Sequence, residues 1–197
     1  MEKTIQQRMQ QHNSTIIRLL LESKTIEKIA KTMINCYKNG GKVIFFGNGG
    51  SCSDSMHLAT ELISRYYIDR KSLPATALTD SVSLTAIGND YNFEEVFKKQ
   101  VEGCVKKGDV IIGISTSGNS KNILKAVDKA KELGGITVAF TGKSGGLLKD
   151  KVDICLNIPS DDTPRIQEGY MLAGHIICEL VEKELFIAFE KATGKNL

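Results

Sequence analysis

The sequence predicts an α/β fold: a three-layer α-β-α sandwich built on a five-stranded parallel sheet. Two observations support this prediction. Short apolar runs alternate with longer segments of helical periodicity, and the runs are almost wholly apolar, as in strands that are covered on both faces. The five runs are KVIFF (42–46), PATAL (74–78), DVIIGI (109–114), ITVAF (136–140) and DICLNI (153–158).

The segment before the first run is predicted to form helices that stop at the NGG sequence of residues 39–41. Apolar side chains recur every three or four positions over residues 26–37, and an earlier helix carries a stripe of Ile5, Met9, Ile16 and Leu20. The stripe must pack on the body of the domain or on a partner subunit. We expect residues 1–40 to belong to the same domain as residues 41–190, followed by a tail at 191–197.

Three further helices follow from the pattern. Residues 92–105 and 120–134 are amphipathic, and the second helix is expected to end at Gly134 and Gly135. A long last helix is predicted from Pro164 to about Glu190. Thr163 is the expected N-cap, since proline suits the first helical position.

Composition narrows the class of protein. The 197 residues, 41% hydrophobic and 25% charged, suit one soluble domain. The net charge of +3 is small and the lysines are scattered, which argues against nucleic-acid and membrane partners. No apolar run approaches the roughly 20 residues of a bilayer span, and no signal-peptide core is present. The five widely spaced cysteines are typical of reduced thiols, so a cytoplasmic protein is expected.

The STSGNS turn, residues 115–120, is a candidate phosphate site. In parallel sheets, ligands bind beyond the carboxyl ends of the strands, and this turn follows the third run and precedes a helix. A glycine, backbone N–H groups at a helix N-terminus and four hydroxyls are the equipment for a phosphate monoester. The alternative is a plain N-cap that uses only Ser117 or Ser120. Four hydroxyls in six residues exceed that need and favour phosphate: Ser115, Thr116, Ser117 and Ser120.

The GNGGS turn, residues 47–51, fails the test for a dinucleotide fingerprint. Cys52 occupies the position of the third glycine, and the candidate ribose-binding acid, Asp80, lies 33 residues beyond Gly47 rather than about 20. No Walker A lysine follows either. The turn is better interpreted as a tight strand–helix connection that lets a substrate approach the backbone.

His57 and Glu61 are four residues apart on the predicted helix after this turn and therefore share a face. As a pair they could be an exposed ion pair, and they supply only half of a four-ligand zinc site. On the last helix Gln167 and His175 are separated by eight residues, or about 12 Å of rise and about 80°. Both side chains must reach towards each other to share a metal, or one must come from a symmetry-related subunit. Alone, His175 would be read as a core histidine.

Four stretches together resemble the sugar-isomerase (SIS) domain of the phosphoheptose isomerases. They are GNGGSCSDSMHLATEL, LTAIGNDYNFEEVF, GDVIIGISTSGNSKNILKA and IPSDDTPRIQEGYMLAGHIICELVE, and the resemblance covers about Ile26 to Phe186. It implies a flavodoxin-like SIS fold and a ketose–aldose isomerase that converts sedoheptulose 7-phosphate to D-glycero-D-manno-heptose 7-phosphate. That reaction is the first step of nucleotide-activated heptose biosynthesis, which feeds lipopolysaccharide or capsule.

The resemblance also implies roles for individual residues. The residues placed against the sugar chain are Asn48, Gly49, Gly50, Ser51, Glu61 and Gln167. Asn89 and Asp90 would contact the polyol, and the four hydroxyls of residues 115–120 would hold the phosphate. One zinc ion per subunit would be associated with His57, Glu61, Gln167 and His175. Glu61 would be the carbon base and His175 the oxygen acid/base in a reaction through a cis-enediol. Family members are homotetramers with active sites at subunit interfaces.

Departures from the family, among them Tyr170, Asn92, Pro164 and Cys52, and three alternatives accompany the resemblance. Tyr170 stands where the family often has histidine, and Asn92 replaces a common glycine, where asparagine tolerates a left-handed conformation. One alternative is the related SIS protein that associates with the replication initiator, which lacks the catalytic carboxylate and second histidine. The others are a module that only senses a phosphosugar and an isomerase of a different sugar phosphate.

Overall fold

The structure, a computed structural model that describes residues 1–187, confirms the predicted α/β class. Five parallel strands form one sheet in the order β2-β1-β3-β4-β5. They are β1 (Val43–Gly47), β2 (Ala75–Ala77), β3 (Val110–Ser115), β4 (Ile136–Thr141) and β5 (Ile154–Asn157), one in each predicted run. The order reverses between β1 and β3, so the turns after these strands flank the crevice where doubly wound sheets bind ligands.

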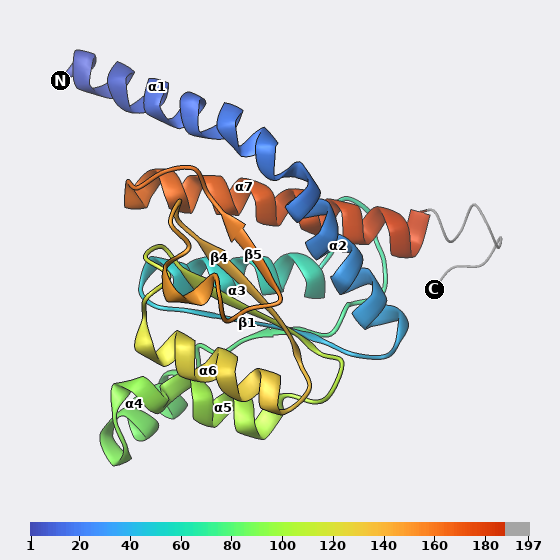
Figure 1. Cartoon of the computed structure of the whole chain (residues 1–197). Coiled ribbons are helices and arrows are strands. Elements are labelled where there is room, and N and C mark those ends of the chain that lie inside the picture. The colour runs from blue at the N-terminus through green and yellow to red at the C-terminus, as the bar shows by residue number, and fades with distance from the viewer. Residues whose placement is uncertain (188–197) are drawn as a thin grey trace.

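Helices cover both faces of the sheet and give the three predicted layers (Figure 1). One layer contains α2 (Ser23–Lys38), α3 (Gly50–Ile63) and α7 (Thr163–Glu182). The other contains α5 (Val96–Cys104) and α6 (Lys121–Glu132), with α4 (Ser81–Asp90) packed on α5. Residues 1–187 also contain three short 3₁₀ turns: η1 (Leu20–Glu22), η2 (Phe93–Glu95) and η3 (Gly146–Leu148).

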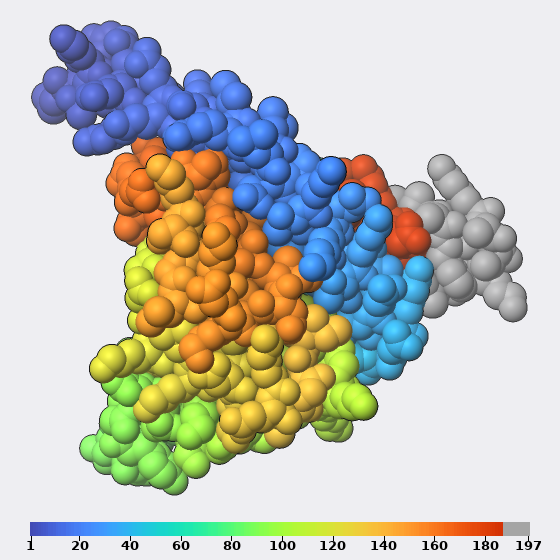
Figure 2. Space-filling view, viewed as in Figure 1, coloured from blue at the N-terminus to red at the C-terminus, as the bar shows by residue number. Residues whose placement is uncertain are grey.

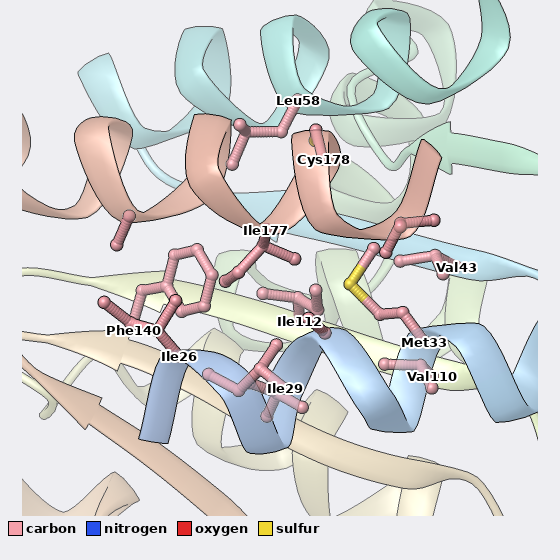
Figure 3. Packing of buried hydrophobic residues seen from close by; sticks show 14 of the residues in the cluster. Ile26, Ile29, Met33, Val43, Leu58, Val110, Ile112, Phe140, Ile177 and Cys178 are labelled. Atoms are coloured by element: carbon pink, nitrogen blue, oxygen red, sulfur yellow. The ribbon is translucent and has the colours of Figure 1, made fainter. Parts of the chain in front are cut away.

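Successive strand residues face opposite layers, which explains why the runs are apolar throughout. In β3, Ile112 faces the layer of α2 and α7, whereas Ile111 faces α5 and α6. Figure 3 shows Met33 of α2 and Ile177 of α7 packed towards Ile112. Each fully buried side chain of this size stabilises the fold by about 1.5–3 kcal/mol. The sheet is therefore a rigid platform for the turns at its edge.

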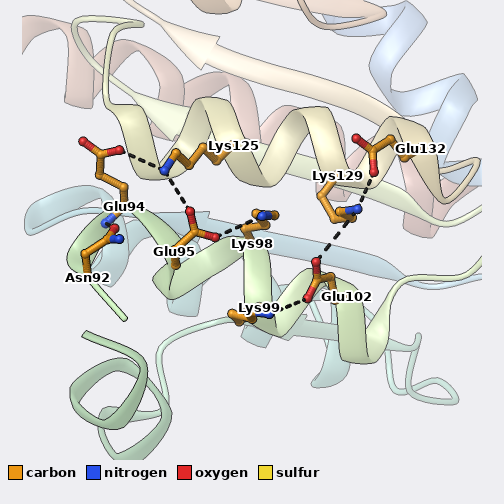
Figure 4. A network of polar contacts seen from close by, with 9 residues as sticks. All are labelled: Asn92, Glu94, Glu95, Lys98, Lys99, Glu102, Lys125, Lys129 and Glu132. Atoms are coloured by element: carbon orange, nitrogen blue, oxygen red, sulfur yellow. Dashed lines mark hydrogen bonds and ion pairs between the residues drawn. The ribbon is translucent and has the colours of Figure 1, made fainter. Parts of the chain in front are cut away.

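An ion-pair network joins α6 to η2 and α5 (Figure 4). The Nζ atom of Lys125 on α6 lies 2.9 Å from Glu94 Oε2 and 2.8 Å from Glu95 Oε1. Lys129, one turn further along α6, faces Glu102 of α5. Each exposed pair contributes little alone, because solvent screens its charges. Together they fix α6 against η2 and α5, and the N-terminus of α6 carries the STSGNS turn.

The predicted N-terminal stripe is largely uncovered in this chain. Helix α1 (Glu2–Leu19) extends beyond the body of the molecule, over the start of α7 (Figures 1 and 2). Ile5, Met9 and Leu20 are 59%, 65% and 70% exposed, and only Ile16 of the stripe packs on the core. The body of the domain therefore leaves most of this stripe uncovered.

Two expectations change, and a third lies outside the described residues. Thr163 is not the N-cap of α7: the cap is Asp162, whose extended backbone precedes the first helical residue, and Thr163 is already helical. Helix α7 ends at Glu182 and continues as a π-helical turn, Lys183–Ile187. The predicted end near Glu190 and the tail at 191–197 lie outside the described residues. Asn92 is extended, with φ −171°, and its side chain accepts the N–H of Glu94, so no left-handed asparagine is needed.

Other expectations on helix ends are confirmed. Helix α2 stops at Lys38, directly before the NGG sequence. Gly134 follows α6 in the left-handed region, with φ +79°, as a C-terminal glycine should. Within residues 1–187, none of the helices combines the length and apolar character of a membrane span.

Candidate active site

The GNGGS turn connects β1 to α3 and leaves an open approach to the backbone. Gly49 is the N-cap of α3, with φ +57°, and a side chain added there would meet open space. The amides of Asn48 and Asn122 exchange two hydrogen bonds of 3.0 and 2.8 Å. This pair ties the turn after β1 to the first turn of α6, across the crevice between β1 and β3. Sequence reasoning missed Asn122, because an asparagine in a first helical turn carries no distinguishing signal.

Ser51, predicted to contact the sugar, has a buried side chain engaged within the protein. Its hydroxyl lies 2.9 Å from the hydroxyl of Tyr170, which also donates to Asp54 Oδ2 at 2.8 Å. The pKa of Asp54 is raised, because the effect of burial outweighs those of the Tyr170 hydrogen bond and the nearby His57, which both lower it. Tyr170 thus fastens α7 to the start of α3. The sequence marked Tyr170 only as a departure from the family and gave no reason to link it to Asp54.

His57, Glu61 and His175 are brought together by the packing of α3 against α7. His57 Nε2 lies 3.0 Å from Glu61 Oε1 and 3.3 Å from His175 Nε2. The rings of the two histidines meet edge to face, with centroids 5.0 Å apart. The His57 side chain is 50% exposed and that of Glu61 25%, so the cluster is open to a ligand. His175 is therefore part of this cluster and not a core histidine.

The donor set of the cluster fits a metal ion such as zinc. One ligand atom from each of His57, Glu61 and His175 lies within 4.8 Å of the other two. Two imidazoles and one carboxylate are a common set of protein ligands for a zinc ion that takes part in catalysis.

Gln167, the fourth predicted ligand, lies against the glycine turn. Its Nε2 atom occupies the space beside Gly50, 2.6 Å from where a Cβ would stand. Gly50 begins α3, whereas His57 lies about 10 Å further along that helix. A glycine at position 50 is what allows Gln167 to approach the turn so closely.

The STSGNS turn forms a compact group of hydroxyls at the N-terminus of α6. Ser115 Oγ lies 3.1 Å from Ser120 Oγ and 3.5 Å from Ser117 Oγ, and it accepts the N–H of Gly118. Ser120 is the N-cap residue of α6, yet its hydroxyl makes no capping hydrogen bond. Ser117 caps no N–H of α6 and instead accepts that of Asn119 within the turn. The plain N-cap alternative therefore does not describe this turn.

Asn89 and Asp90 lie at the exposed C-terminal end of α4, in the layer opposite α3 and α7. Within residues 1–187, these two side chains are hydrogen-bonded to each other: Asn89 Nδ2 donates to Asp90 Oδ1 at 3.0 Å. Helix α4 packs on α5 and η2. The fold of one chain thus does not link these two residues to the His57 cluster.

The fold and the site define an α/β protein with a hydroxyl-rich turn at the sheet switch point and acid–base groups on two neighbouring helices. A model of the SIS domain matches residues 9–142, and the chain belongs to the SIS domain family. A phosphoheptose isomerase of Clostridium acetobutylicum is 54% identical over 82% of this chain and 83% of its own length.

Solved structures agree with the sequence comparison. A phosphoheptose isomerase from Francisella tularensis superposes with a TM-score of 0.83 at 36% identity, covering 90% of this chain and 97% of that one. The phosphoheptose isomerase from Neisseria gonorrhoeae gives a TM-score of 0.82 at 39% identity over 91% and 99%. The enzyme class of this chain is accordingly that of an isomerase.

Proposed function

We propose that the protein converts sedoheptulose 7-phosphate to D-glycero-D-manno-heptose 7-phosphate. The observation that carries this proposal is the cluster of His57, Glu61 and His175, whose side chains meet within hydrogen-bonding distance on an open surface. A protein that only sensed a phosphosugar, or only associated with another protein, would need none of these three groups. Relatives at about half identity are phosphoheptose isomerases, which supports a heptose phosphate as the substrate.

The STSGNS turn holds the phosphate in this proposal. Its hydroxyls and the N-terminus of α6 offer neutral donors and a favourable helix dipole to the dianion. The side chains involved are Ser115, Thr116, Ser117 and Ser120. The sugar chain then runs along the glycine turn, past Asn48, Gly49, Gly50 and Ser51, towards Gln167 and Glu61. The Ser51 hydroxyl, which is hydrogen-bonded to Tyr170, shapes the turn. The substrate binds against the backbone at Gly49, where no other atoms stand in the way.

The isomerisation moves one proton between adjacent carbons and one between two oxygens. Glu61 removes the proton from the carbon next to the carbonyl and returns it to the neighbouring carbon, through a cis-enediol. His175 carries the oxygen proton. His57 contacts both groups and orients them, since its Nε2 lies 3.0 Å from Glu61 and 3.3 Å from His175.

A zinc ion would be held at this site by His57, Glu61 and His175, and Gln167 is the proposed fourth ligand. Bound there, the metal would supply Lewis-acid polarisation of substrate oxygens. The proton transfers remain the work of the chain's own carboxylate and imidazole.

Assembly into a homotetramer completes the site in this proposal. The apolar side chains Ile5, Met9 and Ile17 of α1 are exposed in a single chain, as those of a subunit interface would be. Asn89 and Asp90, remote from the cluster in one chain, would reach the polyol of a neighbouring subunit. The protein acts in the cytoplasm, and its product leads to nucleotide-activated heptose for lipopolysaccharide or capsule.

The decisive experiment is an assay of purified protein with sedoheptulose 7-phosphate, with the aldoheptose phosphate measured directly. Arabinose 5-phosphate and fructose 6-phosphate serve as competing substrates. Turnover of the heptose at least tenfold faster than of either competitor is expected. Tight binding without turnover would instead favour a phosphosugar-sensing protein, and preference for a shorter sugar would favour a different isomerase.

A further inference from the structure

Arg70 and Glu182 form a buried ion pair beside the site, and neither has a part in the proposed chemistry. Arg70 Nε lies 2.9 Å from Glu182 Oε1, and the two side chains are 2% and 1% exposed. Removing one partner from such a pair costs about 3–5 kcal/mol, whereas a well-packed apolar replacement of both is often neutral. The stability of the fold is therefore a weak explanation for why two charged side chains are buried at this position.

Arg70 binds the end of the helix that carries Glu61. Its Nη2 donates to the Glu61 carbonyl at 3.0 Å, and its Nη1 donates to the Leu62 carbonyl at 2.8 Å. These are two of the last carbonyls of α3, which no later helical N–H can satisfy. The cation also lies at the negative end of the helix dipole. The last turn of α3 is thereby fixed at the residue proposed as the carbon base.

Glu182 binds the chain that follows α3. Its carboxylate accepts the backbone N–H groups of Tyr66, Tyr67 and Ile68 at 3.0, 2.8 and 3.3 Å. The ring of Tyr66 lies against that of His175, with centroids 6.2 Å apart. Burial opposes ionisation of Glu182, but its four donors outweigh burial and lower its pKa. The group is a carboxylate at neutral pH.

Glu182 and His175 belong to the same helix and the same face of it. Their separation of seven residues on α7 corresponds to about two turns, or about 10 Å. The guanidinium of Arg70 also lies over the ring of Phe186, 5.3 Å from its centroid, in the turn after α7. The pair thus joins the helix of Glu61 to the helix of His175 through one salt bridge.

We propose that Arg70 and Glu182 are positioning residues, which set the distance between Glu61 and His175 during the reaction. The proposal rests on the proposed function for its kinetic consequence. Misplacing a reacting group by about 1 Å can reduce the rate about a hundredfold. Loss of the pair should therefore lower kcat while leaving the phosphate turn, and so KM, nearly unchanged.

The test compares Glu182→Gln and Arg70→Lys with a matched control, Asp109→Asn. Asp109 is also a buried carboxylate, which accepts two backbone N–H groups and pairs with Lys42. It precedes β3 and lies at the amino end of the strands, away from the site. Each variant keeps a polar group of similar size. All three are expected to lower Tm.

Only the Arg70 and Glu182 variants are expected to lower kcat, by about tenfold to a hundredfold with KM within about twofold. Imidazole NMR resonances of His57 and His175 should shift in the same two variants and stay in place in Asp109→Asn. Equal kcat losses in all three variants, or unmoved imidazole resonances, would overturn the proposal. The NMR measurement needs no substrate, so it tests the positioning role of Arg70 and Glu182 even if the protein does not turn over sedoheptulose 7-phosphate.

A variant that fails to fold is replaced by the double variant Arg70→Met with Glu182→Leu. This change removes both charges together, which buried pairs tolerate better than the loss of one partner. The same fall in kcat and the same imidazole shifts are expected, because the apolar pair cannot hold the carbonyls of Glu61 and Leu62. Wild-type kcat in a folded double variant would overturn the proposal.

Discussion

The Nε2 atoms of His57 and His175 lie 3.3 Å apart, although 118 positions separate the two residues in the chain. A hydrogen bond over this distance needs one nitrogen to donate and the other to accept. Glu61 Oε1, 3.0 Å from His57, completes the group. The first two predictions follow from this contact.

Replacing Glu61 with glutamine should lower kcat by a factor of about 100 or more, because a general base contributes about 10²–10⁴-fold. Binding of the phosphosugar, measured by calorimetry, should persist. The control is Glu27→Gln, which breaks another glutamate pair of the same i,i+4 spacing, with Lys31, on the surface of α2. Near-normal turnover of the Glu61 variant would remove this residue from the mechanism.

The three histidines of the chain allow a matched test of the metal. His57→Ala and His175→Ala should each reduce the zinc content of purified protein at least tenfold, since loss of one of three strong ligands leaves an incomplete site. His12→Ala should retain zinc, because His12 pairs with Glu168 away from the cluster. Elemental analysis by mass spectrometry provides the measurement. Equal zinc in all three variants would contradict the assignment.

Loss of two hydroxyls from the STSGNS turn should weaken binding of the phosphate. A hydrogen bond to a charged group is worth about 1.5–3 kcal/mol, so Ser117→Ala with Ser120→Ala should raise KM at least tenfold. Inorganic phosphate should inhibit the wild type and have little effect on the variant. An unchanged KM would mean that the phosphate binds elsewhere.

Tyr170→Phe should destabilise the protein and loosen the glycine turn. The change leaves Asp54 and the buried Ser51 without their shared partner, at a cost of about 1–3 kcal/mol. A lower Tm and a raised KM are expected, with zinc content retained. A KM equal to that of the wild type would show that the hydroxyl stabilises the fold without shaping the turn.

The lowered pKa of Glu182 gives a pH dependence with a definite sign. Its stabilisation is fully present above its unfolded value, near 4.5, and is lost as the pH falls through its lower folded pKa. The difference in Tm between wild type and Glu182→Gln should therefore be largest near neutral pH and shrink in acid. Thermal melts at pH 7 and below pH 4 measure it. A difference that grew in acid would contradict the lowered pKa.

The strands and turns could be predicted because their signals are local. Each apolar run contains one strand of the sheet, and Gly134 ends α6 since glycine alone takes its conformation without strain. Thr163 failed as an N-cap because Asp162 and Thr163 are both good capping residues. The backbone, which turns helical at Thr163, decides between them.

The site could be predicted only in part, because its contacts join distant segments. His57 and Glu61 share a helix, so their proximity follows from spacing. The link to His175 came from the family resemblance. The partners of Asn48, Ser51 and Glu182 could not be read from the chain, since each lies across the packing of two helices or of a helix and a loop.

The spacing of His175 and Glu182 constrains how the chain can vary. One residue inserted between them would rotate Glu182 by about 100° about the axis of α7 and move it about 1.5 Å along it. The carboxylate would then face away from Arg70 while His175 kept its place. Insertions and deletions should therefore be excluded from this stretch of α7, because they would break the register between His175 and Glu182.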